Sequence, residues 1–358
     1  MTLSIAFLGS SLVSAYWNGA ATYYRGILQA LAANGHRITF YEPDAYDRQH
    51  HRDIPDPDWA RVVVYPATED GVEQALDMAR NADLLVKASG VGVFDTLLEA
   101  RIPSLRRPGA IAAFWDVDAP ATLDRIAGDS GDPFRRLIPA YDIVFTYGGG
   151  PPVVSRYTAF GARLCVPIYN GLDPATHRPA APDPRFACDL GLVANRLPDR
   201  ERRIDEYFLA VAAELHDRSF VLAGAGWGDK PMPPNIRYVG HLYTADHNAF
   251  NASALAVLNV SRDSMAACGY SPATRVFEAA GAGTCIITDS WEGIAMFFEP
   301  GKEILVAENG PEIAERLARL TPDEARRIGE AARTRALAEH TYAQRVALVE
   351  DVLAGRLR

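Results

Sequence analysis

Short runs of apolar residues alternate along the first half of the chain with longer segments in which apolar residues recur at helical spacing. This alternation is typical of a parallel sheet whose strands are joined by helices. The expected strands lie at residues 4–8, 37–41, 84–87, 111–115 and 143–146. Between the first two, a helix at about residues 20–33 is predicted to end at Asn34-Gly35, where glycine supplies a left-handed cap. The chain therefore opens with a β-α-β unit.

A proline-rich stretch interrupts this pattern at residues 170–186, because proline cannot continue a helix or an internal strand. The pattern then restarts, with strands expected at residues 189–194, 220–223, 236–239, 254–260 and 284–288. We predict two Rossmann-like domains separated by a linker, and a C-terminal helix that could pack back on the N-terminal domain. Their bounds are 1–169 for the first domain, 170–185 for the linker, 186–335 for the second domain and 336–358 for the helix.

Length, composition and charge limit the class of protein. One hydrophobic core rarely organises 358 residues, and 48% hydrophobic with 23% charged residues is an ordinary globular composition. The net charge of −9 disfavours a general role on nucleic acid, and no apolar stretch is long enough to cross a bilayer. The first apolar run lacks the features of a signal peptide, so we expect a cytoplasmic protein. The cysteines have no metal-ligand spacing and are interpreted as small buried side chains: Cys165, Cys188, Cys268 and Cys285.

Within residues 270–283, a helix with a capped start is predicted to begin near Pro272. Ser271 suits the N-cap and Pro272 the first helical position. The N–H groups of such a helix end, together with Tyr270, Thr274 and the charged side chain of Arg275, would suit a diphosphate. Glu278, one turn further on, could accept hydrogen bonds from ribose hydroxyls. The alternative is a capped helix with a solvated Arg–Glu pair.

Several separated motifs in the C-terminal half resemble one enzyme family. Glu278-Ala-Ala-Gly-Ala-Gly283 is similar to a glutamate-alanine-x-alanine-x-glycine helix, and Tyr169-Asn-Gly-Leu-Asp173 to an asparagine-glycine-x-aspartate segment between domains. Both belong to group-1 GT-B glycosyltransferases. Within that superfamily the sequence looks closest to the CgeB-like branch, through Asn259-Val-Ser-Arg262, Arg275-Val-Phe-Glu278 and Trp291-Glu-Gly293.

The resemblance implies the GT-B fold, in which two Rossmann-like, doubly wound parallel-sheet domains face each other across a cleft. It implies that Glu278 binds ribose and that cationic residues after the first strand of the second domain bind the diphosphate. The candidates there are Arg196, Arg202 and Arg203, each of which could instead belong to a solvated helix start. It also places Gly240 and His241 near the base, although a lone histidine in a loop is more often structural.

One position departs from the family pattern. Many retaining members carry a second glutamate eight positions before the ribose-binding one, and here that position is Tyr270. The resemblance therefore does not decide between retention and inversion. Asp289, Glu292 and Glu299 follow the next strand and could approach the sugar, although spacing alone assigns none of them.

Two aspartates in the N-terminal half are candidates for a general base. Asp116 and Asp118 follow an expected buried strand and precede Pro120, a position from which a carboxylate can face a ligand. Asp116 is preferred because it lies nearer the strand end. The alternative is a turn-forming aspartate that binds its own backbone. The resemblance gives this half the role of binding the acceptor.

These observations predict a hexosyltransferase-like enzyme that moves a sugar from a nucleoside-diphosphate sugar to an acceptor hydroxyl. No metal site is expected, and no cofactor besides the donor, because protein cations can stabilise the leaving diphosphate. The acceptor is a glycan, a small molecule or a protein. The competing hypothesis is a GT-B binding or assembly protein without turnover. A nicotinamide-dependent oxidoreductase is disfavoured, because neither Gly9-Ser-Ser nor Gly224-Ala-Gly226 completes the dinucleotide fingerprint.

Overall fold

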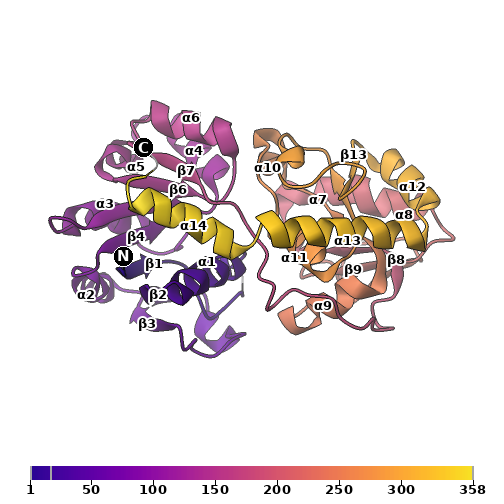
Figure 1. Ribbon diagram of the computed structural model, residues 1–358, viewed down its shortest axis with the longest axis horizontal. Coiled ribbons are helices and arrows are strands. Elements are labelled where there is room, and N and C mark those ends of the chain that lie inside the picture. The colour runs from indigo at the N-terminus through magenta and orange to yellow at the C-terminus, as the bar shows by residue number, and fades with distance from the viewer. Residues whose placement is uncertain (1, 17, 357–358) are drawn as a thin grey trace. The chain divides into compact units, whose positions relative to one another are not determined.

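The computed structural model describes residues 2–16 and 18–356. The chain forms two compact units, which Figure 1 colours by residue number. Unit 1 is Met1–Asn170 together with Tyr342–Arg358, and unit 2 is Gly171–Thr341. The expected linker at 170–185 therefore lies almost entirely inside unit 2. The expected boundary at 335/336 falls within a helix, α13, and the chain returns to unit 1 at Tyr342.

Unit 1 contains a seven-stranded parallel sheet with the strand order β3-β2-β1-β4-β5-β6-β7. Its order changes direction between β1 and β4, and in doubly wound sheets ligands bind near this point, at the carboxyl ends of the strands. The strands are β1 Ser4–Leu8, β2 Arg37–Asp44, β3 Ala60–Pro66, β4 Leu84–Ala88, β5 Ile111–Asp116, β6 Ile143–Thr146 and β7 Cys165–Pro167. The helices are α1 Ala21–Ala33, α2 Glu69–Ala79, α3 Asp95–Leu105, α4 Ala119–Gly128, α5 Pro133–Leu137 and α6 Gly150–Ala159.

The last helix of the chain, α14 (Tyr342–Leu353), completes the core of unit 1. Figure 1 shows it beside α1, and Val346 and Val349 on it are fully buried. Gly26 of α1 permits this packing, because a Cβ atom at that position would lie 2.2 Å from the ring of Tyr342. Aromatic side chains extend the same core beneath the sheet, where Trp115 donates a hydrogen bond to the Tyr23 hydroxyl at 2.9 Å.

Unit 2 contains a six-stranded parallel sheet with the order β10-β9-β8-β11-β12-β13. The strands are β8 Cys188–Val193, β9 Phe220–Ala223, β10 Ile236–Tyr238, β11 Ala254–Asn259, β12 Ile286–Asp289 and β13 Leu305–Ala307. The helices are α7 Pro198–Ile204, α8 Ala210–Glu214, α9 Thr244–Ser253, α10 Asp263–Cys268, α11 Thr274–Ala282, α12 Gly310–Arg319 and α13 Pro322–Glu339. A π-helical turn, Asp205–Leu209, joins α7 to α8.

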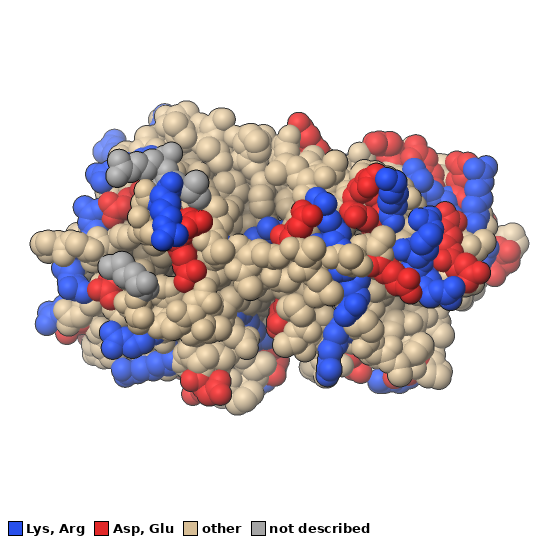
Figure 2. Space-filling model, viewed as in Figure 1, with Lys and Arg blue, Asp and Glu red and all other residues tan. Residues whose placement is uncertain are grey.

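The exposed faces of α12 and α13 carry charges of both signs. Arg319 pairs with Glu315 at 2.9 Å, and Arg326 pairs with Asp323 at 2.7 Å. Figure 2 shows blue and red side chains intermixed over this region. Among the helices of the described residues, none combines the length and the apolar character that crossing a membrane requires.

The helix predicted to begin near Pro272 starts two residues later, so Ser271 as its N-cap and Pro272 as its first helical position were wrong predictions. Helix α11 starts at Thr274 with Ala273 as its N-cap. The preceding chain turns through Gly269 and Tyr270, whose φ angles are 68° and 47°, and the Tyr270 N–H donates to the Glu292 carbonyl at 2.7 Å. Pairing with the loop after β12 therefore replaces the expected first turn.

The cysteines also differ in part from the expectation. Cys165 and Cys285 are buried, whereas Cys188 and Cys268 are partly exposed. Burial raises the pKa of Cys165 and of Cys285 to about 12. All four are free thiols in the structure.

The contact between α1 and α14 gives a first prediction. Gly26→Ala should lower the free energy of unfolding by about 1–3 kcal/mol, because the added methyl group overlaps the buried Tyr342 ring. The helix propensity of alanine offsets at most ~1 kcal/mol of this loss. Urea unfolding measures the effect. Gly128→Ala, at the end of α4 with open space around it, is the matched control and should not destabilise the protein. Equal stability of both variants would contradict the packing of α14 on α1.

Candidate functional site

Polar side chains of unit 2 meet where β11 and β12 end. Asn259, the last residue of β11, donates from its amide to the Thr288 hydroxyl at 3.0 Å. Asp289, the last residue of β12, accepts hydrogen bonds from the backbone N–H and the hydroxyl of Ser261. Because both strands are parallel neighbours in the sheet, these side chains lie at one edge. This edge therefore carries a polar network that links the ends of β11 and β12.

Asp289 is fully buried and forms an ion pair with Arg203 of α7, at 2.6 Å between Nη2 and Oδ2. Burial raises the pKa of Asp289 above its ordinary value, while Arg203 and the hydrogen bonds from Ser261 oppose that rise. The Arg203 side chain is 15% exposed and lies over the Tyr207 ring. Arg203, predicted to bind a diphosphate, is thus already engaged by a buried carboxylate.

The other two candidate arginines have different surroundings. Arg196 pairs with Glu201 at 2.9 Å and with Asp229 at 2.8 Å. Together with Lys230 it lowers the pKa of Glu201 to about 2. Arg202 is 77% exposed and approaches Asp263 only at 3.7 Å. The structure therefore leaves Arg202 on the surface, while Arg196 and Arg203 are held by carboxylates near the strand ends.

Helix α11 carries Arg275 and Glu278 on neighbouring faces. Arg275 donates to the Asn259 amide oxygen at 3.3 Å, which links the helix to the end of β11. Burial lowers the pKa of Arg275, and the nearby carboxylates of Glu278 and Asp289 raise it. Glu278 is 13% exposed and faces two histidines, His177 and His247. The structure thus brings together Arg275, Glu278 and the polar edge of the sheet.

The residues predicted around the start of α11 have distinct positions. Thr274 is the first residue of the helix and is partly exposed. The Ser271 hydroxyl is buried and has no hydrogen-bond partner among the described residues. The Tyr270 hydroxyl donates to the Glu292 carboxylate at 2.9 Å. Tyr270 therefore holds an acidic side chain from the loop after β12.

Gly240 and His241 follow β10. The Gly240 carbonyl accepts a hydrogen bond from the Gly224 N–H at 2.7 Å, which joins the loops after β9 and β10. Gly224 has a φ of 128°, and a Cβ atom there would lie 2.0 Å from the Ala194 carbonyl oxygen. His241 packs edge-on against exposed Tyr243, with 4.7 Å between the ring centres. Close backbone packing thus places these loops beside the end of β8.

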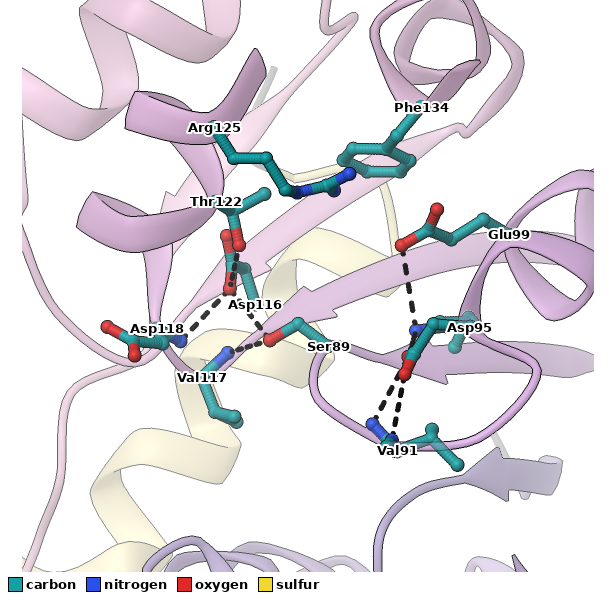
Figure 3. Close-up of polar contacts among 12 residues, drawn as sticks. Ser89, Val91, Asp95, Glu99, Asp116, Val117, Asp118, Thr122, Arg125 and Phe134 are labelled. Atoms are coloured by element: carbon teal, nitrogen blue, oxygen red, sulfur yellow. Dashed lines mark hydrogen bonds and ion pairs between the residues drawn. The ribbon is translucent and has the colours of Figure 1, made fainter. Parts of the chain in front are cut away.

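In unit 1, Asp116 ends β5 and is fully buried (Figure 3). Its Oδ1 accepts from the Ser89 hydroxyl, the Asp118 N–H and the Thr122 hydroxyl, and its Oδ2 accepts from Tyr157. Burial raises its pKa, and these four hydrogen bonds oppose the rise. A general base needs an oxygen that a substrate can reach. The geometry instead gives Asp116 the turn-forming role, because it accepts from the backbone two residues on.

Asp118 is the more accessible of the two aspartates. It stands at the N-cap of α4 and is partly exposed. Its carboxylate accepts no capping hydrogen bond from the first turn of α4, whose residues all lie in the part of the chain that the structure describes. Asp116 binds the Asp118 backbone N–H, so the buried aspartate orients the exposed one.

A cavity of about 300 Å³ lies beside Asp116, next to the ends of β4 and β5. Its wall includes Glu99 and Arg125, both visible in Figure 3. Beneath it the fully buried Lys87 forms an ion pair with Asp95 and approaches Glu99 at 3.8 Å. Burial raises the pKa of Glu99, while Lys87 and Arg125 lower it. The sequence did not reveal this cavity. Its buried cation, Lys87, is a single charged residue within an apolar strand, and no sequence motif marks it.

Residues 200–351 match the model of a family described as glycosyl transferase-like. This range includes α11, the ends of β11 and β12, and the arginines of α7. A search of curated proteins gives no significant match.

Three solved structures share the architecture of the whole chain. HepE from Anabaena in complex with UDP-glucose has a TM-score of 0.69 at 14% identity, covering 99% of this chain and 100% of that one. An α-glucosyltransferase in complex with UDP and a 13-mer DNA has a TM-score of 0.73 at 11% identity, covering 99% of this chain and 100% of that one. AviGT4, a glycosyltransferase involved in avilamycin A biosynthesis, has a TM-score of 0.63 at 19% identity, covering 99% of this chain and 98% of that one. With its two parallel-sheet units, the chain has the GT-B fold.

The buried pair gives a second prediction. Arg203→Met should lower the free energy of unfolding at pH 7 by about 3–5 kcal/mol, because it leaves Asp289 charged and uncompensated in the interior. The neighbouring Arg202→Met changes only an exposed side chain and should stay within about 0.5 kcal/mol of the parent.

The sign of the pH dependence follows from the same pair. Loss of Arg203 raises the pKa of Asp289 further, since Arg203 is the largest influence that lowers it. A carboxyl group whose pKa is raised by folding stabilises the protein below its unfolded pKa and loses that contribution as the pH rises. The defect of Arg203→Met should therefore shrink as the pH falls toward about 4. A defect that is constant with pH in urea unfolding would contradict the role assigned to Asp289.

Proposed function

We propose that this protein is a glycosyltransferase that moves a sugar from a UDP-sugar to an acceptor hydroxyl. The observation that carries the proposal is the arrangement of Arg275 and Glu278 on α11, beside the polar ends of β11 and β12, within the range that matches the glycosyl transferase-like family. UDP is the proposed diphosphate because structures of the same fold contain UDP or UDP-glucose. A hexosyl donor and membership of the CgeB-like branch are parts of the same proposal.

Glu278 is the proposed ligand of the ribose hydroxyls. Its carboxylate is partly exposed and can accept hydrogen bonds from a diol. Arg275 lies one turn earlier on the helix and is linked to Asn259, which orients its guanidinium. The N–H groups of the first turn of α11 add neutral donors for the diphosphate, as does the Ser271 hydroxyl, which has no hydrogen-bond partner in the part of the chain that the structure describes. We propose that these groups stabilise the leaving UDP without a metal ion or a further cofactor.

Tyr270 bears on the choice between an active enzyme and a binding protein without turnover. It replaces the glutamate that many retaining relatives carry, yet its hydroxyl holds the carboxylate of Glu292 at 2.9 Å. Glu292 thus supplies an acidic side chain beside the altered position. This contact favours the enzyme over the silent binding protein.

On the acceptor side we propose Asp118 as the general base and Asp116 as the residue that positions it. The side chain of Asp118 is partly exposed, as proton abstraction from a substrate hydroxyl requires, whereas that of Asp116 is fully buried and accepts four hydrogen bonds. The cavity beside Asp116, with Glu99 and Arg125 in its wall, has the polar lining that a hydroxylated acceptor would require.

The donor assignment is tested by ligand-induced thermal shifts. UDP should raise the melting temperature, whereas GDP, dTDP, CMP and reduced nicotinamide cofactor should not, since a ligand of the native state stabilises it by mass action. Glu278→Gln should weaken UDP binding roughly tenfold or more, because hydrogen bonds to a charged acceptor contribute about 1.5–3 kcal/mol. Glu299→Gln, on an exposed loop and paired with Lys302, is the matched control and should bind UDP normally. If no nucleotide raises the melting temperature, the competing hypothesis of a binding protein without turnover is favoured.

The base assignment is tested by kinetics. Asp118→Asn should lower kcat by about 10²–10⁴-fold while UDP binding and the melting temperature stay unchanged, because only proton abstraction is lost. UDP release from the UDP-sugar, measured with a panel of glycans and small alcohols as acceptors, gives the rate. Asp124→Asn, on the same helix and paired with Arg156 at the surface, is the control. A full rate for Asp118→Asn would refute its role as base.

A further inference from the structure

Two histidines and the proposed ribose ligand form a compact cluster in unit 2. The Nε2 atom of His177 lies 3.7 Å from Glu278 Oε1, and the Nδ1 atom of His247 lies 3.9 Å from Glu278 Oε2. One potential ligand atom from each of the three residues lies within 4.8 Å of the others. These separations exceed hydrogen-bond length, so the groups face one another without being bonded.

Both ring nitrogens that face the carboxylate are buried and have no hydrogen-bond partner among the described residues. The His177 side chain is only 2% exposed. Buried polar atoms in folded proteins almost always have a partner, and leaving one unpaired costs about 1–3 kcal/mol. Two such atoms aimed at the same carboxylate therefore indicate a ligand common to all three groups.

The residue types of the cluster identify the kind of ligand. Imidazole nitrogens and a carboxylate oxygen are the atoms that divalent transition metals bind in proteins, and here one such atom from each of three residues faces the same small space. The His247 side chain is 21% exposed and that of Glu278 is 13% exposed, so this space is largely shielded from water.

Two contacts hold the cluster together before any ligand arrives. Asn248 of α9 accepts from the Arg178 N–H at 3.2 Å and donates to the Thr176 carbonyl at 2.8 Å, which fixes the chain on both sides of His177. Gly281 of α11 lets the same segment approach the helix, since a Cβ atom there would lie 2.8 Å from the His177 carbonyl oxygen. The three ligating groups thus come from three mutually packed elements.

We infer that His177, His247 and Glu278 bind one divalent transition-metal cation, with Zn²⁺ as the best match. Two imidazoles and one carboxylate are a known zinc ligand set that leaves a fourth position open. Zinc–ligand distances of about 2.0–2.2 Å place tetrahedral ligand atoms ~3.3 Å apart. The two separations from Glu278 exceed this value by about half an ångström, and the widest separation in the cluster, at most 4.8 Å, exceeds it by no more than about 1.5 Å. Mg²⁺ and Ca²⁺ are disfavoured, because they require more ligands and prefer oxygen.

The site has a consequence for donor binding, which rests on the proposed function. When the Glu278 carboxylate ligates zinc, it is a weaker hydrogen-bond acceptor for the ribose hydroxyls. Zn²⁺ should therefore weaken UDP binding, and a chelator should restore it. The cation here regulates access to the donor site and takes no part in the transfer step.

Direct binding of zinc to tag-free protein, first stripped with a chelator and then dialysed, tests the inference. Titration calorimetry should show one Zn²⁺ per chain and no binding of Mg²⁺, and Co²⁺ in place of zinc should give the intense visible bands of a four-coordinate site. His177→Ala and His247→Ala should each weaken zinc binding at least about tenfold. His216→Ala, which changes an exposed histidine outside the cluster, is the control. The far-UV circular dichroism and the melting temperature of each variant, recorded without metal or nucleotide, show whether it has folded.

The outcomes separate this inference from the proposed function. Absence of zinc binding, or unchanged zinc binding by both folded cluster variants, overturns the inference even if UDP binds. Zinc binding that is lost in those variants supports it even if no nucleotide binds, in which case the proposed function fails alone. If both ligands bind and zinc does not weaken the UDP shift, the regulatory consequence is wrong.

Discussion

The position of α11 is the constraint on which the candidate donor site depends. Two glycine contacts bring its backbone against neighbouring elements: Gly281 against the segment carrying Leu172 and His177, and the Gly283 carbonyl against Gly329 of α13. A Cβ atom at Gly329 would lie 2.0 Å from that carbonyl oxygen, so no side chain fits between the helices. Because α11 packs closely against both neighbours, Arg275 and Glu278 are presented at defined positions. Protein interiors are close-packed and barely compressible, so these backbone contacts restrict where the side chains of α11 can lie.

Each unit uses a buried aspartate at a strand end to organise the loop that carries more accessible groups. Asp116 ends β5 and binds the Asp118 N–H, whereas Asp289 ends β12 and binds Ser261 and Arg203. A buried carboxylate is tolerable only when its oxygens are satisfied. The partners that satisfy it become ordered as a result. This explains why the side chains that end the strands are structural, while the chemistry is assigned to residues beside them.

The histidine cluster adds a different kind of order to the donor region. His177 and His247 both direct a ring nitrogen at Glu278 without bonding it, which leaves the carboxylate able to accept hydrogen bonds from a diol or to bind a cation. A carboxylate bound to buried cations would be less available to a neutral ligand. The structure thus surrounds Glu278 with two imidazole rings that do not bond to it and with the guanidinium of Arg275 nearby.

The sequence alone determined the class of fold. Apolar runs that alternate with segments of helical period indicate strands buried in a parallel sheet, and this pattern does not depend on how individual side chains pack. The sequence also singled out Glu278 and Arg275 as candidates, because their segment resembles the glutamate-alanine-x-alanine-x-glycine helix of a known family. Only the tertiary structure separated Asp116 from Asp118, moved the start of α11 to Thr274 and paired Arg203 with Asp289. Each of these depends on partners far away in the chain. His177 and His247 are 70 residues apart and His247 and Glu278 are 31 apart, so no local pattern could show that the three groups meet.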